Sequence, residues 1–99
     1  MAEHIGTTLR RVRRQREDSQ EKVAALLGMT QPTFSRLERG RIEAPQASHG
    51  AIARYLSTNG DRVTVAEVRH QIDHYALVRR EAELAAELDK VRGQLAAHG

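Results

Sequence analysis

The 99-residue sequence contains no cysteine and no tryptophan. Without cysteine there is no disulfide, no thiolate metal site and no cysteine nucleophile, and nothing indicates an oxidising compartment. The only aromatic residues are Phe34, Tyr55 and Tyr75, so Leu, Val, Ile and Ala must fill the interior. Strand-rich proteins of this size usually carry more aromatic residues, so the composition predicts an all-α fold.

Long hydrophobic runs are also lacking. No apolar segment approaches the roughly 20 residues of a membrane span, and the N-terminus has no hydrophobic signal-peptide segment. We therefore expect a cytoplasmic protein with no membrane partner. A chain of this length has room for one small domain and an appendage, not for two substantial cores.

Positive charge is concentrated in the first part of the chain. Residues 1–60 contain 10 Lys and Arg against 6 Asp and Glu, a formal charge of +4, whereas residues 61–99 contain 6 against 7, a charge of −1. This asymmetry is compatible with an anionic partner and equally with an ordinary solvated surface.

Apolar spacing and capping residues predict three short helices in the first 40 residues. The first covers residues 5–16 and has an apolar stripe with arginines on its other faces. Ser19 is the N-cap of a second helix that ends at Gly28, and Thr30 is the N-cap of a third that ends at Gly40. The second and third helices are therefore joined by a very short turn.

The remaining chain divides near residue 60. Residues 41–45 are predicted to form a loop, residues 46–56 a fourth helix, and Asn59 and Gly60 a turn that closes the first unit. We expect residues 1–60 to form one domain and residues 61–99 a C-terminal helical segment.

The C-terminal segment has its own helix start. Thr64 and Glu67 form a capping box, with apolar residues at 63 and 68 as a hydrophobic staple. Helical spacing then continues to about residue 97, with no glycine or proline before Gly93, which predicts one long helix or two helices with a kink. A short strand at residues 62–68 is the competing prediction, because Val63 and Val65 alternate with polar residues.

A short helix, a glycine turn and a short capped helix are typical of a helix-turn-helix, whose second helix enters the DNA major groove. Polar and small side chains, Gln31, Pro32, Thr33, Ser35 and Arg36, remain on the outer face of the third helix. Glutamine can pair with adenine and arginine with guanine, and threonine or proline can contact a thymine methyl group. The alternative is an ordinary solvated helix face.

The segment IGTTLRRVRRQREDSQEKVAALLGMTQPTFSRLERG resembles the lambda-repressor-like, or XRE, family of helix-turn-helix transcriptional regulators. The resemblance covers roughly half of the chain, from Ile5 to about Leu56. It implies a DNA-binding domain of four to five helices, followed here by a long C-terminal helix. It also implies double-stranded DNA as partner and no cofactor.

The resemblance assigns roles to individual positions. Base-reading residues would be Gln31, Pro32, Thr33 and Arg36. Contacts to the DNA backbone would come from Gln20, Thr30, Arg39 and Arg41. Arg10 and Glu38 match positions that form an ion pair between the first and third helices of relatives. A phosphate contact is the alternative for Arg10.

Two departures from the family pattern concern the DNA-binding region. Pro32 stands where relatives often carry a hydrogen-bond donor. Glu17 and Asp18 replace a glycine and a leucine before the second helix, which removes a core side chain and places acidic groups near DNA. We expect a rearranged loop or weaker binding from the second change.

The C-terminal helix is predicted to be a dimerisation element, because relatives bind DNA as two-fold dimers on half-sites about one helical turn apart. An apolar row with partial heptad spacing, interrupted by Glu81, comprises Leu77, Leu84, Leu88, Val91 and Leu95. Two alternatives remain. The row packs on its own first domain, or it binds another protein, as in the antitoxin of a toxin–antitoxin pair.

Metal binding and catalysis find little support in the sequence. His70 and His74 are four residues apart, but no further ligand completes a metal site. No motif places a nucleophile beside a base, so we do not expect an enzyme. The sequence therefore predicts a DNA-binding transcriptional regulator, in its finer form a dimeric repressor.

Overall fold

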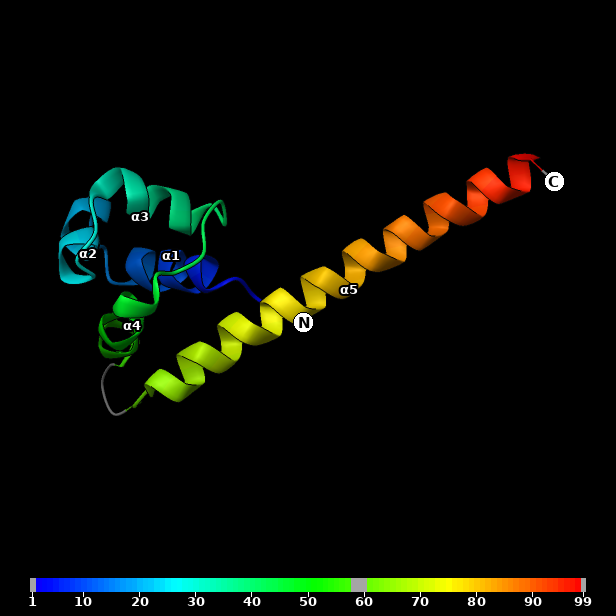
Figure 1. The fold of residues 1–99 in the computed structure, drawn as a ribbon. Coiled ribbons are helices and arrows are strands. Elements are labelled where there is room, and N and C mark those ends of the chain that lie inside the picture. Colours follow the sequence, from blue (N-terminus) through cyan, green and yellow to red (C-terminus); the bar gives the residue numbers. More distant parts are fainter. Residues whose placement is uncertain (1, 58–60, 99) are drawn as a thin grey trace.

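The computed structural model describes residues 2–57 and 61–98, and the secondary-structure elements among these residues are helices, with no β-strand. The predicted all-α fold is therefore confirmed. The predicted turn at Asn59 and Gly60 lies outside the described residues. Five α-helices and one short 3₁₀ helix follow each other along this described part of the chain (Figure 1): α1 Ile5–Gln15, α2 Gln20–Leu26, α3 Gln31–Glu38, η1 Gln46–Ser48, α4 His49–Leu56 and α5 Val65–His98.

Side-chain caps and glycine stops set the limits of the short helices. The Ser19 Oγ accepts the Lys22 N–H at 3.0 Å at the start of α2, and the Thr30 Oγ1 accepts the Thr33 N–H at 3.3 Å at the start of α3. Gly28 and Gly40 end these helices with φ of +72°. A residue with a Cβ adopts this left-handed backbone only at a cost, which explains glycine at both stops.

The hydrophobic core lies between α1, α2, α3, α4 and the first turns of α5. Its fully buried side chains are Ile5, Leu9, Val23, Phe34, Leu37, Ile52 and Val68. Gly6 lets α1 approach α3 closely, because a Cβ built there would lie 1.8 Å from the Leu37 carbonyl oxygen. The two helices thus meet backbone to backbone.

The fourth helix begins differently from its prediction. Residues 46–48 form the 3₁₀ turn η1, and the α-helical part starts only at His49. The Ser48 hydroxyl donates to the Leu27 carbonyl at 3.3 Å, and a ring nitrogen of His49 lies 3.3 Å from the Ala44 carbonyl. These contacts tie the start of α4 to the end of α2 and to its own preceding loop.

Helix α5 starts with the predicted capping box. The Thr64 Oγ1 accepts the Glu67 N–H at 3.1 Å, and the Glu67 carboxylate accepts the Thr64 N–H at 3.4 Å. A helix therefore begins at Val65, and the competing strand prediction for residues 62–68 is wrong. Because Val68 is fully buried in the core, the first turns of α5 complete the folded unit that residues 5–56 begin.

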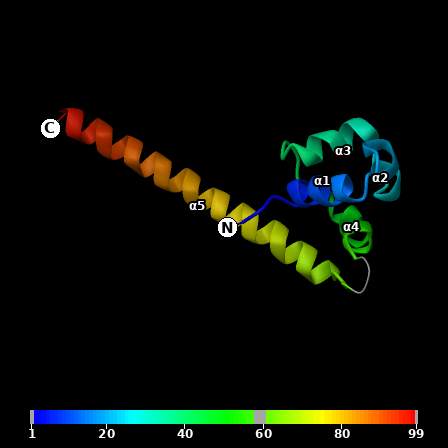
Figure 2. The same cartoon turned by 180° about the vertical axis from the view of Figure 1, so that it is seen from behind.

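The second half of α5 leaves the folded unit. Figures 1 and 2 show it projecting away from the other helices from both viewing directions. The molecule measures 60 × 27 × 24 Å with a radius of gyration of 17.4 Å, whereas a compact chain of this length has about 13 Å. We call residues 5–56 together with residues 61–75 the head, and residues 77–98 the tail.

Candidate nucleic-acid interface

The predicted interface consists of the start of α2 and the outer face of α3. Gln20 is the first residue of α2 and Gln31 the first residue of α3, so the two side chains extend from neighbouring helix N-termini. On α3 the side chains of Phe34, Leu37 and Glu38 are buried and face the interior of the head. Gln31, Pro32, Arg36 and Arg39 are exposed, and Thr33 is half-buried.

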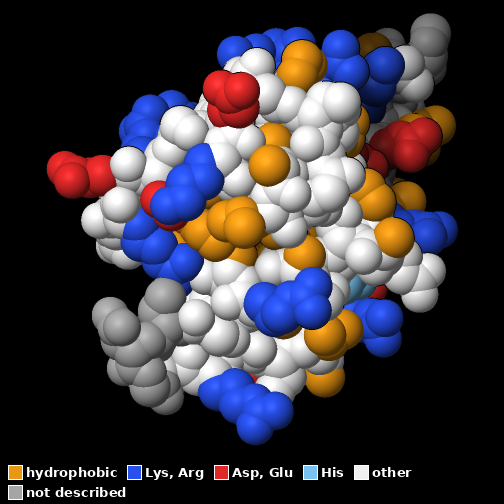
Figure 3. Space-filling model, turned by 90° about the vertical axis from the view of Figure 1, so that its left-hand side faces the viewer, with side chains coloured by type: hydrophobic (Ala, Val, Ile, Leu, Met, Phe, Trp, Pro, Cys, Tyr) orange, Lys and Arg blue, Asp and Glu red, His pale blue; other side chains and the backbone are white. Residues whose placement is uncertain are grey.

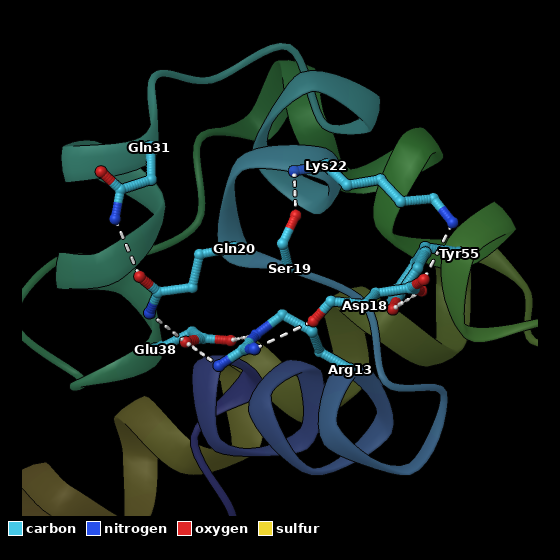
Figure 4. Close-up of polar contacts among 8 residues, drawn as sticks. All are labelled: Arg13, Asp18, Ser19, Gln20, Lys22, Gln31, Glu38 and Tyr55. Carbon is cyan, nitrogen blue, oxygen red and sulfur yellow. Dashed lines mark hydrogen bonds and ion pairs between the residues drawn. The ribbon is translucent and has the colours of Figure 1, made fainter.

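A hydrogen-bonded chain connects Gln31 to the interior (Figure 4). The Gln31 Nε2 donates to the Gln20 Oε1 at 2.9 Å, and the Gln20 Nε2 donates to the Glu38 Oε1 at 2.7 Å. The Arg13 guanidinium donates to both Glu38 oxygens, at 2.7 and 3.1 Å. The chain therefore runs from a buried ion pair outward to a polar group on the surface.

Glu38 pairs with Arg13 rather than with Arg10, so the predicted Arg10–Glu38 ion pair is wrong. Arg10 is exposed, whereas the side chains of Arg13 and Glu38 are only 14% and 2% exposed. The reason is helix geometry. Arg13 follows the buried Leu9 by one helical turn and shares its inward face, whereas Arg10 is rotated from Leu9 by about 100°.

The Arg13–Glu38 pair crosslinks α1 to α3. The hydrogen bonds from Arg13 to Glu38 raise the pKa of the guanidinium, so it stays charged. Arg13 also donates to the Asp18 carbonyl at 3.1 Å, which ties the loop before α2 to the same guanidinium. One cation thus orients α3 and the loop at the start of α2 together.

The loop at Glu17 and Asp18 keeps its shape by polar contacts. Glu17 has a φ of +57°, the left-handed conformation that glycine would adopt without strain. The Asp18 carboxylate accepts hydrogen bonds from Tyr55 at 2.8 Å and from Lys22 at 2.9 Å. Asp18 thereby connects α2 to α4 through polar bonds.

These contacts change the ionisation of both partners. Hydrogen bonds from Lys22 and then from Tyr55 lower the pKa of Asp18. Burial, followed by the Asp18 carboxylate, raises the pKa of Tyr55 to about 12. The Arg16 guanidinium lies 4.5 Å from the centre of the Tyr55 ring and donates to the Tyr55 carbonyl.

The other predicted DNA-contacting residues stand around α3. Thr30 caps α3, and its hydroxyl also donates to the Thr33 hydroxyl at 2.9 Å. Arg39 and Arg41 are exposed at the end of α3 and in the following turn. Figure 3 shows Lys and Arg side chains spread over one face of the head, with fewer Asp and Glu side chains among them.

Two contributors to the head were missed in the sequence. Gly6 permits the α1–α3 contact, and His4 caps α1 because its Nδ1 accepts the Gly6 N–H at 3.0 Å. The His4 ring also packs edge-on against Tyr75 of α5, with ring centres 5.0 Å apart. Histidine at an N-cap gives little signal in a single sequence, since Ser, Thr, Asp and Asn are the usual caps.

The chain belongs to a helix-turn-helix domain family, whose model matches residues 4–65, more than half of the sequence. The matched region contains every helix of the head up to the first residue of α5. Proteins with a helix-turn-helix domain of this kind are DNA-binding regulators. No match was found among curated proteins or among solved structures.

Other kinds of site gain no support in the described residues. No group of three potential metal ligands is present there, and His70 and His74 simply stack with ring centres 6.1 Å apart. None of the described helices has both the length and the apolar character needed to cross a bilayer.

Proposed function

We propose that the protein is a sequence-specific transcriptional regulator of the lambda-repressor-like, or XRE, type, which acts by binding DNA rather than by catalysis. The observation that carries this proposal is the hydrogen-bonded chain from Arg13 through Glu38 and Gln20 to Gln31. A side chain with no role outside the protein gains little from being held in one orientation at a surface. A side chain that must meet one base edge gains accuracy from it.

Base reading is assigned to α3. Gln31 presents its amide to adenine, and Arg36 presents its guanidinium to guanine in the major groove. Pro32 and Thr33 supply apolar contact with a thymine methyl group, and Thr33 adds a hydroxyl. Because Gln20 already bonds to Gln31 and Glu38, its side chain positions Gln31, and its backbone N–H at the start of α2 is the group that we assign to a phosphate.

The remaining cations contact the phosphates. Arg39 and Arg41 are exposed just after α3, where they extend the reading face at its C-terminal end. Such contacts set affinity and salt dependence and carry no sequence information. Two copies of the chain bind as a dimer, one α3 to each half-site, and repress by occluding a promoter.

A second function is favoured by one observation, the uncovered apolar row of the tail. Leu77, Leu84, Leu88 and Leu95 are each more than half exposed, a feature also expected of an antitoxin-type protein whose tail binds another protein. In that case the head only regulates its own gene.

The test begins with the selection of bound fragments from random DNA, followed by binding measurements on the selected site. Gln31→Ala and Arg36→Ala should each lose about 1–3 kcal/mol of discrimination at one base pair of each half-site. Matched controls are Gln94→Ala and Arg79→Ala on the exposed surface of α5. Arg41→Ala should instead weaken binding to all sequences and flatten the salt dependence. Unchanged preference after both Gln31 and Arg36 are truncated would refute base reading by α3.

A further inference from the structure

The tail carries an apolar row, interrupted once by Glu81, that nothing in the described chain covers. The exposed fractions are 57% for Leu77, 57% for Leu84, 55% for Leu88, 45% for Val91 and 67% for Leu95. From Leu84 onward the residues are separated by four, three and four positions, the spacing of a coiled-coil seam. Glu81 occupies the one seam position between Leu77 and Leu84 that is not apolar.

The row faces away from the head. Val68, Ile72 and Tyr75 form the face of α5 that packs against the head. Leu77 follows Val68 by about two and a half helical turns and Leu84 by about four and a half, so both lie on the opposite face. The head therefore cannot cover the row by a small adjustment, and the expectation that the row packs on its own domain is wrong.

We infer that the tail pairs with the tail of a second copy of this chain, in a parallel and in-register two-stranded coiled coil. This inference deepens the dimer of the proposed function, but it rests on the tail alone and can be tested without DNA. In this arrangement each apolar residue of the row meets its own copy, which gives five apolar layers. The two heads lie at the same end and on opposite sides of the coil.

Charges beside the row favour the parallel arrangement. In a parallel coiled coil, a residue flanking one side of the seam meets the residue five positions later on the second helix. Glu87 therefore lies beside Arg92 of the second copy, and the symmetric pair forms on the other side. Glu81 in the seam meets Glu81 of the second copy, and Arg80 of each chain lies beside this layer and offsets its negative charge.

The antiparallel alternatives are less complementary. The alignment that keeps all five apolar residues in the seam sets Leu77 opposite Leu95, but it brings Glu87 against its own copy. Like charges in this position repel. A shift by one heptad in one direction moves Leu77 past Leu95, the last residue of the opposing row, and a shift in the other sets Leu84 opposite Glu81.

The length of the seam predicts weak, concentration-dependent pairing. Residues 77–95 extend about 28 Å along the helix, which is less than three heptads. Since one of the six seam positions is Glu81, we expect monomer and dimer to exchange over an accessible concentration range.

Cysteine crosslinking distinguishes the orientations, since the chain has no cysteine of its own. Under mild oxidation, Leu95→Cys should form a disulfide-linked dimer, because the two substituted positions meet only in the parallel arrangement. Ala86→Cys, on the outer face of the same helix, is the matched control and should stay monomeric. A mixture of Leu77→Cys and Leu95→Cys chains that crosslinks preferentially to each other would instead identify an antiparallel coil and overturn the inference.

Sedimentation measures the same pairing with no introduced thiol. Leu84→Ala combined with Leu88→Ala should weaken dimerisation by roughly tenfold or more while the head keeps its melting temperature. Glu87→Lys and Arg92→Glu should each weaken it by roughly fivefold, and the double exchange should restore it. A chain that remains monomeric at every concentration overturns the inference and assigns the row to another protein, whereas base reading by α3 is left standing.

Discussion

The head and the tail are both helical, yet they are stabilised in opposite ways. Helices of the head are short, from 7 to 11 residues for α1 to α4, and each is held by caps and by burial against its neighbours. The tail is a continuation of one 34-residue helix whose side chains from Ala76 to Ala97 are all exposed. Short helices need tertiary packing to persist in water. A long helix rich in leucine and alanine is more stable by itself, and a partner serves mainly to cover its apolar row.

The difference teaches where function can reside. The head has a filled core and can therefore hold polar side chains such as Gln20 and Gln31 in fixed orientations. The tail has no interior, so its apolar residues are available only to another chain. One region is suited to reading a rigid ligand and the other to association.

The largest expected effect is the loss of unfolding free energy caused by a substitution in the core of the head. Phe34→Ala removes a fully buried ring and should cost about 3–5 kcal/mol of the free energy of unfolding, a large part of the stability of a small domain. Leu84→Ala should change it by less than about 0.5 kcal/mol when the protein is dilute and monomeric. Urea unfolding followed by circular dichroism measures both. A larger cost for Leu84→Ala would show that the tail packs on the head.

Next in size is the ion pair inside the head. Arg13→Met leaves the Glu38 carboxylate buried without its cation and should cost about 3 kcal/mol of unfolding free energy. Arg10→Met removes an arginine from the same helix at an exposed position and should stay within about 0.5 kcal/mol. The same denaturation experiment compares them. Equal costs for the two variants would contradict the assignment of Arg13 as the partner of Glu38.

The pH dependence of the head should reflect Asp18 and Tyr55. The pKa of Asp18 is lowered in the folded protein. Its contribution to the stability of the head is therefore present above pH 3.8, the ordinary pKa, and is lost as the pH falls below 3.8. The pKa of Tyr55 is raised to about 12. Its contribution to the stability of the head is therefore present below pH 10 and is lost as the pH rises from 10 to 12. Melting temperatures measured across both ranges should show the two losses.

The variant that isolates this pair is Tyr55→Phe. This variant should no longer lose stability between pH 10 and 12. Its loss of stability at acid pH should also be smaller, because Asp18 then keeps only Lys22 as a hydrogen-bond donor. The control is Tyr75→Phe at the start of α5, since it removes a tyrosine whose contact is with His4. An alkaline profile that responds to Tyr75→Phe and not to Tyr55→Phe would contradict the assignment.

The smallest effect is expected at the strained loop residue. Glu17 has a φ of +57°, so Glu17→Gly should stabilise the head by about 1 kcal/mol through relief of the left-handed strain. The same exchange at Glu83, in the helical tail, should not stabilise the protein, because glycine weakens a helix interior. Thermal unfolding compares the two variants. Destabilisation by Glu17→Gly would show that the loop gains more from glutamate than it loses by strain.

Much of the fold could be predicted from the sequence because helix ends are local. Ser19, Thr30 and Thr64 each supply an oxygen to a backbone N–H three residues away, and Gly28 and Gly40 each take a positive φ. These effects depend on neighbours in the chain and not on the rest of the fold. The predicted limits of α2, α3 and α5 therefore agree with the structure to within about two residues.

The candidate site could be predicted only in part. Exposure of Gln31 and Arg36 follows from helical spacing, but the chain of hydrogen bonds behind Gln31 does not. It requires α2 and α3 to cross so that residues 20, 31 and 38 meet. The inward position of Arg13 has a local signal in the sequence, because Arg13 lies one helical turn after Leu9 and Arg10 does not.

The sequence by itself determined where each helix starts and stops, since caps, glycine stops and apolar spacing act over a few residues. Only the tertiary structure decided which side chain of α3 meets Arg13, why Gly6 is needed and which face of α5 the head covers. These outcomes depend on how closely and at what angle helices pack, and packing joins residues that are far apart in the chain. Short-range rules set the helices of this protein, and long-range contacts arranged them into a polar outer face on α3 and an uncovered tail.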